Sequence, residues 1–207
     1  MTYIEKIAFH LGKRDEVPNQ ELARLLVEKE DQAGIDEIVS FLDDTNKSIQ
    51  SDCIKVVYEI GYIAPHLITK YADKFIDLLD SKSNRMVWGA MIGLSTIAEY
   101  VPDKIWPYRE KILQMISSGS VITNVSGVRT LINLAKAGNL YFSGLIDHLM
   151  NLQKQCRDVD FAKRAEEMVD VISPAYIEEY RKILEDRKPN FSNSAQKRLE
   201  KVIKKIE

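Results

Sequence analysis

The residues that could perform catalysis are few and scattered along the chain. It contains three histidines and two cysteines: His10, His66, His148, Cys53 and Cys156. None of them has the spacing of a metal site or of a redox pair. Gly12-Lys13 lacks the upstream Gly and the downstream Ser or Thr of a phosphate-binding loop, and the sequence has no G-x-G-x-x-G, G-x-S-x-G or H-E-x-x-H motif. We therefore expect no enzyme, no catalytic residue, no cofactor and no metal ion.

Composition and charge exclude further classes. Lys and Arg number 29 and Asp and Glu 31, so the net charge of −2 provides no overall positive field for a nucleic acid. With 9 Gly and 6 Pro in 207 residues, the chain lacks the turn residues of a loop-rich or all-β fold. Its first residues do not show the basic and apolar regions of a secretion signal, so we expect no secretion, and no apolar run is long enough to span a membrane. We expect a cytoplasmic protein, with Cys53 reduced and buried in an apolar helix.

A repeat of 37 residues organises the chain. Shifting the sequence by this length superimposes the segment that starts at Ser51 on the segment that starts at Trp88. The shift pairs Val57 with Leu94, Ile60 with Ile97, Pro65 with Pro102, Tyr71 with Tyr108 and Phe75 with Ile112, and a second shift reaches Leu131, Leu134, Leu145 and Leu149. Apolar residues within each unit have helical spacing, and a Pro ends the first helix. Each unit is therefore an antiparallel helix pair that must stack on its neighbours to bury its apolar stripe.

These units predict an all-α fold, a right-handed α-solenoid of about five stacked antiparallel helix pairs. We expect one domain over residues 1–207. The predicted repeats cover residues 19–45, 46–82, 83–119, 120–156 and 157–188. Capping helices are predicted at residues 2–11 and 192–207, because the ends of a solenoid meet water on one side.

Small and aliphatic residues alternate in register along the first helices. Cys53, Ala90 and Gly127 share one column, Val57, Leu94 and Leu131 the next, and Gly61, Ala98 and Ala135 a third. Over residues 19–187 this pattern resembles the HEAT-repeat superfamily and its armadillo-like relatives. It departs from many HEAT units in lacking a Val-Arg pair early in the first helix. In such a solenoid the second helices usually line the concave side, where extended partners bind.

Polar columns on the second helices are the first candidates for binding. Asp73, Glu110 and Asp147 form an acidic column, Lys74, Lys111 and His148 an adjacent basic one, and Asp77, Gln114 and Asn151 a polar one. One interpretation is a mixed-charge groove for a protein segment. The alternative is that these side chains pair between repeats and solvate the face, where an exposed pair contributes about 0–1 kcal/mol.

Two tryptophans interrupt their columns. Trp88 aligns with Ser51 and Val125, and Trp106 aligns with Thr69 and Ser143. An exposed aromatic residue is a typical interface anchor, although Trp106 could instead fix the start of its helix and Trp88 could fill a repeat junction. The predicted partner-binding residues are Asp73, Lys74, Asp77, Trp88, Trp106, Glu110, Lys111, Gln114, His148 and Asn151.

The C-terminal segment differs in charge from the rest. Residues 187–207 carry a net charge of +5, and the remainder carries −7. A basic amphipathic helix can contact a membrane surface or a nucleic acid. Cations near a helix C-terminus also complement the helix dipole, and we expect this helix to be a polar cap.

Fold analogy and the lack of catalytic motifs predict a non-catalytic protein-interaction module, such as a scaffold, adaptor or regulatory subunit. It would bind a partner protein or peptide along the concave face. The alternative is a nucleic-acid-binding protein related to the alkylation-repair DNA glycosylases, which share a HEAT-like fold but would need a basic groove. A HEAT-like lyase that attaches a pigment to a carrier has no support beyond the fold. Whether the chain forms a homo-oligomer stays open.

Overall fold

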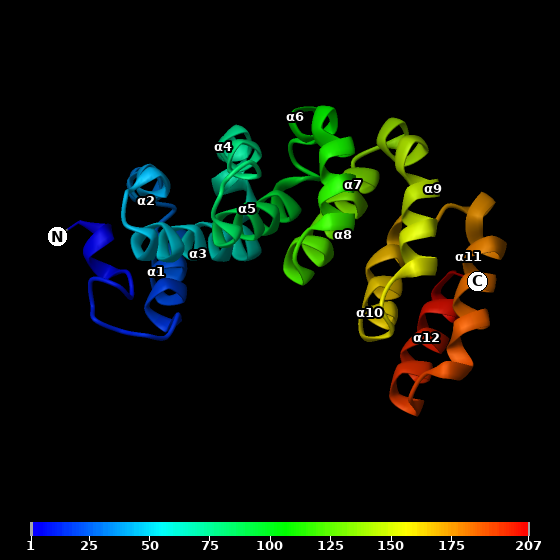
Figure 1. The fold of residues 1–207 in the computed structure, drawn as a ribbon. Helices are drawn as coiled ribbons and strands as arrows, with labels where there is room; N and C mark the ends of the chain where they lie inside the picture. The colour runs from blue at the N-terminus through cyan, green and yellow to red at the C-terminus, as the bar shows by residue number, and fades with distance from the viewer. Residues whose placement is uncertain (1, 207) are drawn as a thin grey trace. The chain divides into compact units, whose positions relative to one another are not determined.

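Helix pairs make up the computed structural model, which describes residues 2–206 (Figure 1). The pairs are α1 (Val17–Glu28) with α2 (Gln32–Ser40), α3 (Lys47–Ile63) with α4 (Ala72–Leu78), α5 (Asn84–Ile97) with α6 (Pro102–Ile105) and α7 (Arg109–Ser118), α8 (Val121–Lys136) with α9 (Asn139–Gln155), and α10 (Asp158–Met168) with α11 (Ile177–Arg187). The last helix is α12 (Asn193–Ile206), and no strand occurs in the part of the chain described. The predicted all-α solenoid of five helix pairs is confirmed.

Short 3-10 helices connect several of these elements. They are Tyr3–Lys6, Phe41–Asp43, Pro65–Tyr71, Trp106–Tyr108, Val169–Val171, Pro174–Tyr176 and Lys188–Asn190. All six prolines lie at the start of a helix: Pro18, Pro65, Pro102, Pro107, Pro174 and Pro189. Proline has a φ suited to a helix start and no N–H to leave unsatisfied there. The second helices of three repeats are consequently entered through proline-containing turns.

The contacts divide the chain into two compact units, residues 1–130 and residues 131–207, with the boundary inside α8. The single domain over residues 1–207 stays a prediction.

The prediction of an N-terminal capping helix at residues 2–11 is wrong. Only Tyr3–Lys6 is helical, as a 3-10 turn, and the chain then continues in turns. Side chains of other elements accept hydrogen bonds from the backbone here. Glu37 Oε1 accepts from the Ile4 amide at 2.9 Å, and Asn19 Oδ1 accepts from the Ala8 amide at 2.9 Å. These tertiary bonds replace the carbonyl partners that an α-helix would supply.

In the first unit, the helices form two layers. α3 packs directly on both α1 and α5, and we call these three helices the inner layer. α2, α4, α6 and α7 are more widely spaced along the opposite edge, and we call them the outer layer (Figure 1). A stack of helix pairs curves toward its more closely spaced layer. The expectation that second helices line the concave side is therefore wrong for this unit, in which the first helices lie inside.

Two glycines of α5 permit this close packing. A Cβ atom at Gly89 would lie 2.6 Å from Cγ1 of Ile54, on α3. One at Gly93 would lie 2.8 Å from Cζ of Phe75, on α4. Carbon atoms in contact are ordinarily about 3.5–4.0 Å apart, so a side chain at either position would require Ile54 or Phe75 to move.

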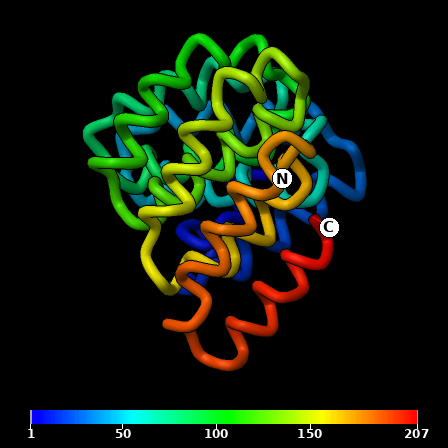
Figure 2. The backbone as a smooth tube through the Cα atoms, turned by 90° about the vertical axis from the view of Figure 1, so that its right-hand side faces the viewer, coloured from blue at the N-terminus to red at the C-terminus, as the bar shows by residue number. Residues whose placement is uncertain are grey.

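In the second unit, the cap predicted at residues 192–207 is a helix over Asn193–Ile206. Leu199, Val202 and Ile206 are its buried residues, and Figure 2 shows it beside α11. Three ion pairs fix it to the preceding repeat, one of them between Lys188 and Glu200 at 2.8 Å. Arg198 donates to both carboxylate oxygens of Glu166 at 2.7 Å, and Lys205 lies 2.6 Å from Asp170.

We predict that Gly93→Ala lowers the free energy of unfolding by about 1–3 kcal/mol, as overpacking does in a filled core. At a helical position with open space around it, the same change would raise the free energy of unfolding by about 1 kcal/mol. The sign of the change therefore shows whether Gly93 is in close contact. Urea denaturation measures it. In a Phe75→Leu background, which removes the end of the ring, the loss should be smaller. A stabilising or fully additive effect would contradict the close contact.

Candidate protein-interaction surface

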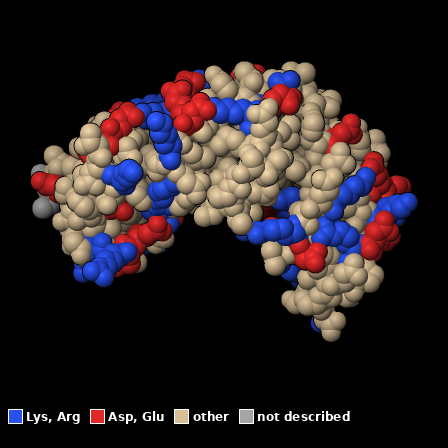
Figure 3. Space-filling model, in the orientation of Figure 1, with Lys and Arg blue, Asp and Glu red and all other residues tan. Residues whose placement is uncertain are grey.

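The lysines of the outer layer pair with carboxylates of the preceding repeat. Lys74 contacts Asp43, Lys104 contacts Asp73 at 2.9 Å, and Lys111 contacts Asp80 at 2.6 Å. Each pair joins residues 31 positions apart, and Figure 3 shows the two charges alternating along this edge of the first unit. This is the pairing between repeats that the alternative interpretation of the polar columns predicts.

The other column residues make fewer contacts. Asp77 and Gln114 are exposed on α4 and α7, and Glu110 lies 3.6 Å from Arg109. His148 and Asn151 are exposed on α9, in the second unit. A role of these residues in partner binding stays a prediction.

The two tryptophans lie in different layers, and both are half-buried. Trp106 precedes α7, and Arg109 covers its ring at 4.5 Å while donating to its carbonyl oxygen at 3.3 Å. These contacts agree with the interpretation that Trp106 fixes the start of its helix, here α7. Trp88 belongs to α5, in the inner layer, and Arg85 covers its ring at 4.0 Å.

Trp88 is part of a larger group of aromatic and basic side chains. We define the inner cluster as Lys55, Tyr58 and Tyr62 from α3 together with Arg85 and Trp88 from α5. The ring of Tyr58 lies 6.2 Å from that of Trp88 and 6.0 Å from that of Tyr62, and the Lys55 ammonium lies 5.0 Å from the Tyr58 ring. Spacings of three and four residues place the members of each helix on one face.

Glu16 connects the two cations of the inner cluster. Its carboxylate lies 2.8 Å from Lys55 and 3.1 Å from Arg85, although 69 residues separate it from Arg85. Lys55, whose side chain is 8% exposed, also pairs with Glu59 at 2.8 Å. Burial lowers the pKa of Lys55, but hydrogen bonds to Glu16 and Glu59 raise it more, so its pKa lies above the ordinary value. Lys55 therefore stays charged at neutral pH.

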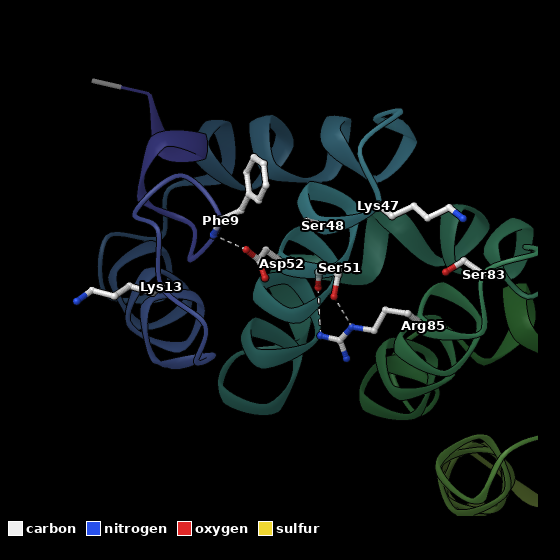
Figure 4. Close-up of a pocket in the computed structure, with 8 residues that line it drawn as sticks. All are labelled: Phe9, Lys13, Lys47, Ser48, Ser51, Asp52, Ser83 and Arg85. Atoms are coloured by element: carbon white, nitrogen blue, oxygen red, sulfur yellow. Dashed lines mark hydrogen bonds between the residues drawn. The ribbon is translucent and has the colours of Figure 1, made fainter.

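Arg85 is fixed against α3. Its Nε donates to Ser51 Oγ at 2.8 Å, and its Nη2 donates to the Ser51 carbonyl oxygen at 3.1 Å. A pocket of about 450 Å³ lies beside this contact, between the N-terminal segment and the first turns of α3 and α5 (Figure 4). Arg85 thus borders both the pocket and the inner cluster.

Two other kinds of site receive no support. Among residues 2–206, no three His, Cys, Asp or Glu side chains lie together in a way that could hold a metal ion. Over the same range, no helix has the length and apolar character needed to cross a membrane.

Sequence reasoning found Trp88 but missed the residues around it. Lys55, Tyr58 and Tyr62 follow a spacing of three and four along a first helix, and Arg85 precedes Trp88 by three residues. That spacing, together with the departure of Trp88 from its column, is the signal that could have indicated the cluster. The contact of Glu16 with Arg85 leaves no such signal.

Comparisons with known proteins identify the fold. No family model and no curated protein matches the sequence. An engineered protein of known structure aligns with a TM-score of 0.63 at 18% identity, covering 100% of this chain and 97% of its own. Computationally designed armadillo repeat proteins for modular peptide recognition align with a TM-score of 0.63 at 15% identity, covering 90% of this chain and 87% of their own. A further designed armadillo repeat protein aligns with a TM-score of 0.61 at 15% identity, covering 99% of this chain and 98% of its own.

The class that these similarities define is the armadillo- and HEAT-like helical repeat fold. The resemblance found in the repeat columns is thereby confirmed at the level of fold. Identities of 15–18% carry no function over to this chain.

We predict that Lys55→Ala lowers the free energy of unfolding by about 2 kcal/mol or more, because it leaves Glu59 half-buried without its cation. Lys70→Ala is the matched control. Lys70 pairs with Asp36 at 2.6 Å, but both side chains are about half exposed, so the loss should be about 0–1 kcal/mol. Thermal or urea denaturation compares them. Equal losses would show that burial of the Lys55 pair has no energetic consequence.

Proposed function

We propose that this chain is a non-catalytic protein-interaction module, a scaffold or adaptor that binds a segment of a partner protein on the inner layer of its first unit. The inner cluster is the observation that carries the proposal. Tyr, Trp and Arg are the residues that most often dominate the binding energy of protein interfaces. All three occur together here, on adjacent helices.

Exposed apolar surface at the Tyr62 end of the inner cluster adds support. Tyr62 and Ile63, at the end of α3, are 51% and 50% exposed. Large apolar side chains that remain exposed next to anchored aromatic rings are typical of binding surfaces. The outer layer offers less to a partner, because several of its lysines already pair with carboxylates of the chain.

The fold is compatible with this proposal. One structural neighbour is described as designed for modular peptide recognition, which states the purpose of that protein. Helix-pair solenoids in general present extended surfaces to elongated partners. The nucleic-acid alternative has less support, since Lys55 and Arg85 are paired with carboxylates and the net charge is −2.

We further propose that the module works in a reducing compartment, the cytoplasm. Cys53 and Cys156 carry free thiols. Cys53 is fully buried, and burial raises the pKa of its thiol, which makes it unreactive.

Affinity capture from a lysate of the source organism tests the proposal with three single variants. Tyr62→Ser and Trp88→Ala should each lose the partner captured by the wild-type protein, because they remove an exposed contact and an aromatic anchor. Asp77→Lys reverses an exposed charge of the outer layer and should retain the partner. Circular dichroism checks that each variant is folded.

The outcomes separate two errors. Capture lost with Asp77→Lys but kept with Tyr62→Ser would place binding on the outer layer. Identical capture by all the folded variants would refute both surfaces. A wild-type protein that captures no partner would refute the protein-interaction function itself.

A further inference from the structure

We infer that the pocket beside Arg85 binds the carboxylate groups of an acidic segment of the partner protein. This inference rests on the proposed function of the inner layer and adds the chemistry of its ligand. The pocket lies between the N-terminal segment and the starts of α3 and α5, and Figure 4 shows the side chains that line it.

The lining is rich in unused hydrogen-bond donors. Lys13 and Lys47 are exposed on opposite sides of the pocket, and in the described range neither has an ion-pair partner. Figure 4 shows both ammonium groups directed outward, on flexible stems that can turn toward a bound anion. Nη1 of Arg85 and the hydroxyls of Ser48 and Ser83 make no hydrogen bond within residues 2–206.

The one carboxylate in the lining is already occupied. Asp52 accepts from the Phe9 amide at 2.7 Å through one oxygen and from Asn19 Nδ2 at 2.9 Å through the other. These bonds hold its charge against the N-terminal segment. Three cations therefore line the pocket: Arg85 pairs with Glu16, Lys13 and Lys47 have no such pair, and the two oxygens of the one lining carboxylate each have a donor. The excess of positive charge and of donors fits an anionic ligand.

Glu16 shows which anion suits this surface. The carboxylate of Glu16, a side chain 51% exposed, bridges Lys55 and Arg85 from outside the α3–α5 contact. It is an internal example of a carboxylate on these cations. An acidic residue of a partner would make equivalent contacts with the remaining donors of Arg85 and with the two free lysines.

The inner cluster argues for a peptide segment over a small anion. A pocket of about 450 Å³ is much larger than one carboxylate, and Arg85 joins it to the ring of Trp88 at 4.0 Å. A ligand that fills both places carries acidic residues next to apolar ones. A protein segment has this composition, and its acidic residues would set the orientation of the apolar contacts.

Fluorescence anisotropy with fluorescein-labelled hexaglutamate, at low salt, tests the inference, with hexaglutamine as the neutral control peptide. We expect the wild-type protein to bind hexaglutamate but not hexaglutamine. Lys13→Gln combined with Lys47→Gln should weaken binding about tenfold, since each exposed charge pair contributes a modest amount. Lys74→Gln combined with Lys111→Gln, in the outer layer, removes the same charge and should leave binding unchanged.

Glu16→Gln provides the decisive variant, because it frees cations without adding any. It should bind hexaglutamate more tightly than the wild-type protein does. In amide NMR spectra of the wild type, the shifts caused by the peptide should centre on Ser48, Ser83 and Arg85.

Three results would overturn the inference. One is no binding of hexaglutamate by either the wild type or Glu16→Gln, and another is equal binding by the two lysine pairs. The third is binding of inorganic phosphate or of a DNA duplex in place of hexaglutamate, which would indicate an oxyanion or nucleic-acid site. If hexaglutamate does not bind while capture of a partner still depends on Tyr62, the inference of an acidic ligand is wrong and the proposed function stands. If hexaglutamate binds at the pocket but no partner depends on Tyr62, the proposed function is wrong.

Discussion

The close contact between α3 and α5 determines the rest of the first unit. Gly89 lies against Ile54 where any side chain would collide, so the two helices approach one another over their small residues. Across this contact Arg85 donates to both the hydroxyl and the carbonyl oxygen of Ser51. The same approach brings the rings of Tyr58 and Trp88 within 6.2 Å. Tight packing of the first helices thus produces both the curvature of the unit and the surface that lies inside it.

Charged residues have two different roles in the two layers. On the outer layer, ion pairs such as Lys111 with Asp80 are partly exposed and link successive repeats at little energetic gain. On the inner layer, Lys55 is nearly buried and depends on Glu16 and Glu59 for its charge to be tolerated. The first arrangement keeps a solvated face in register. The second holds two cations, each paired with a carboxylate, beside aromatic rings.

Much of the fold could be predicted from the sequence, because it depends on local spacing. The 37-residue period, the prolines at helix starts and the small residues of the first helices all follow from short-range chemistry. The helix expected at residues 2–11 was wrong because its backbone amides bond to distant side chains such as Glu37 and Asn19. The prediction that the second helices line the concave side was also wrong for the first unit. The curvature depends on the relative spacing of the two layers of helices, which local sequence patterns do not determine. For the same reason the candidate site was found only in part: Glu16 and Arg85 are 69 residues apart, and no pattern connects them.

The central claim is that the closely packed layer of first helices, and not the charged layer of second helices, is the binding surface. Hydrogen–deuterium exchange of the whole chain, with and without a saturating captured partner, tests it most directly. The account predicts slower exchange in α3 and α5, strongest at the ends that contain Ser51 and Arg85, with α4 and α7 unchanged. Protection confined to α4 and α7 would contradict it.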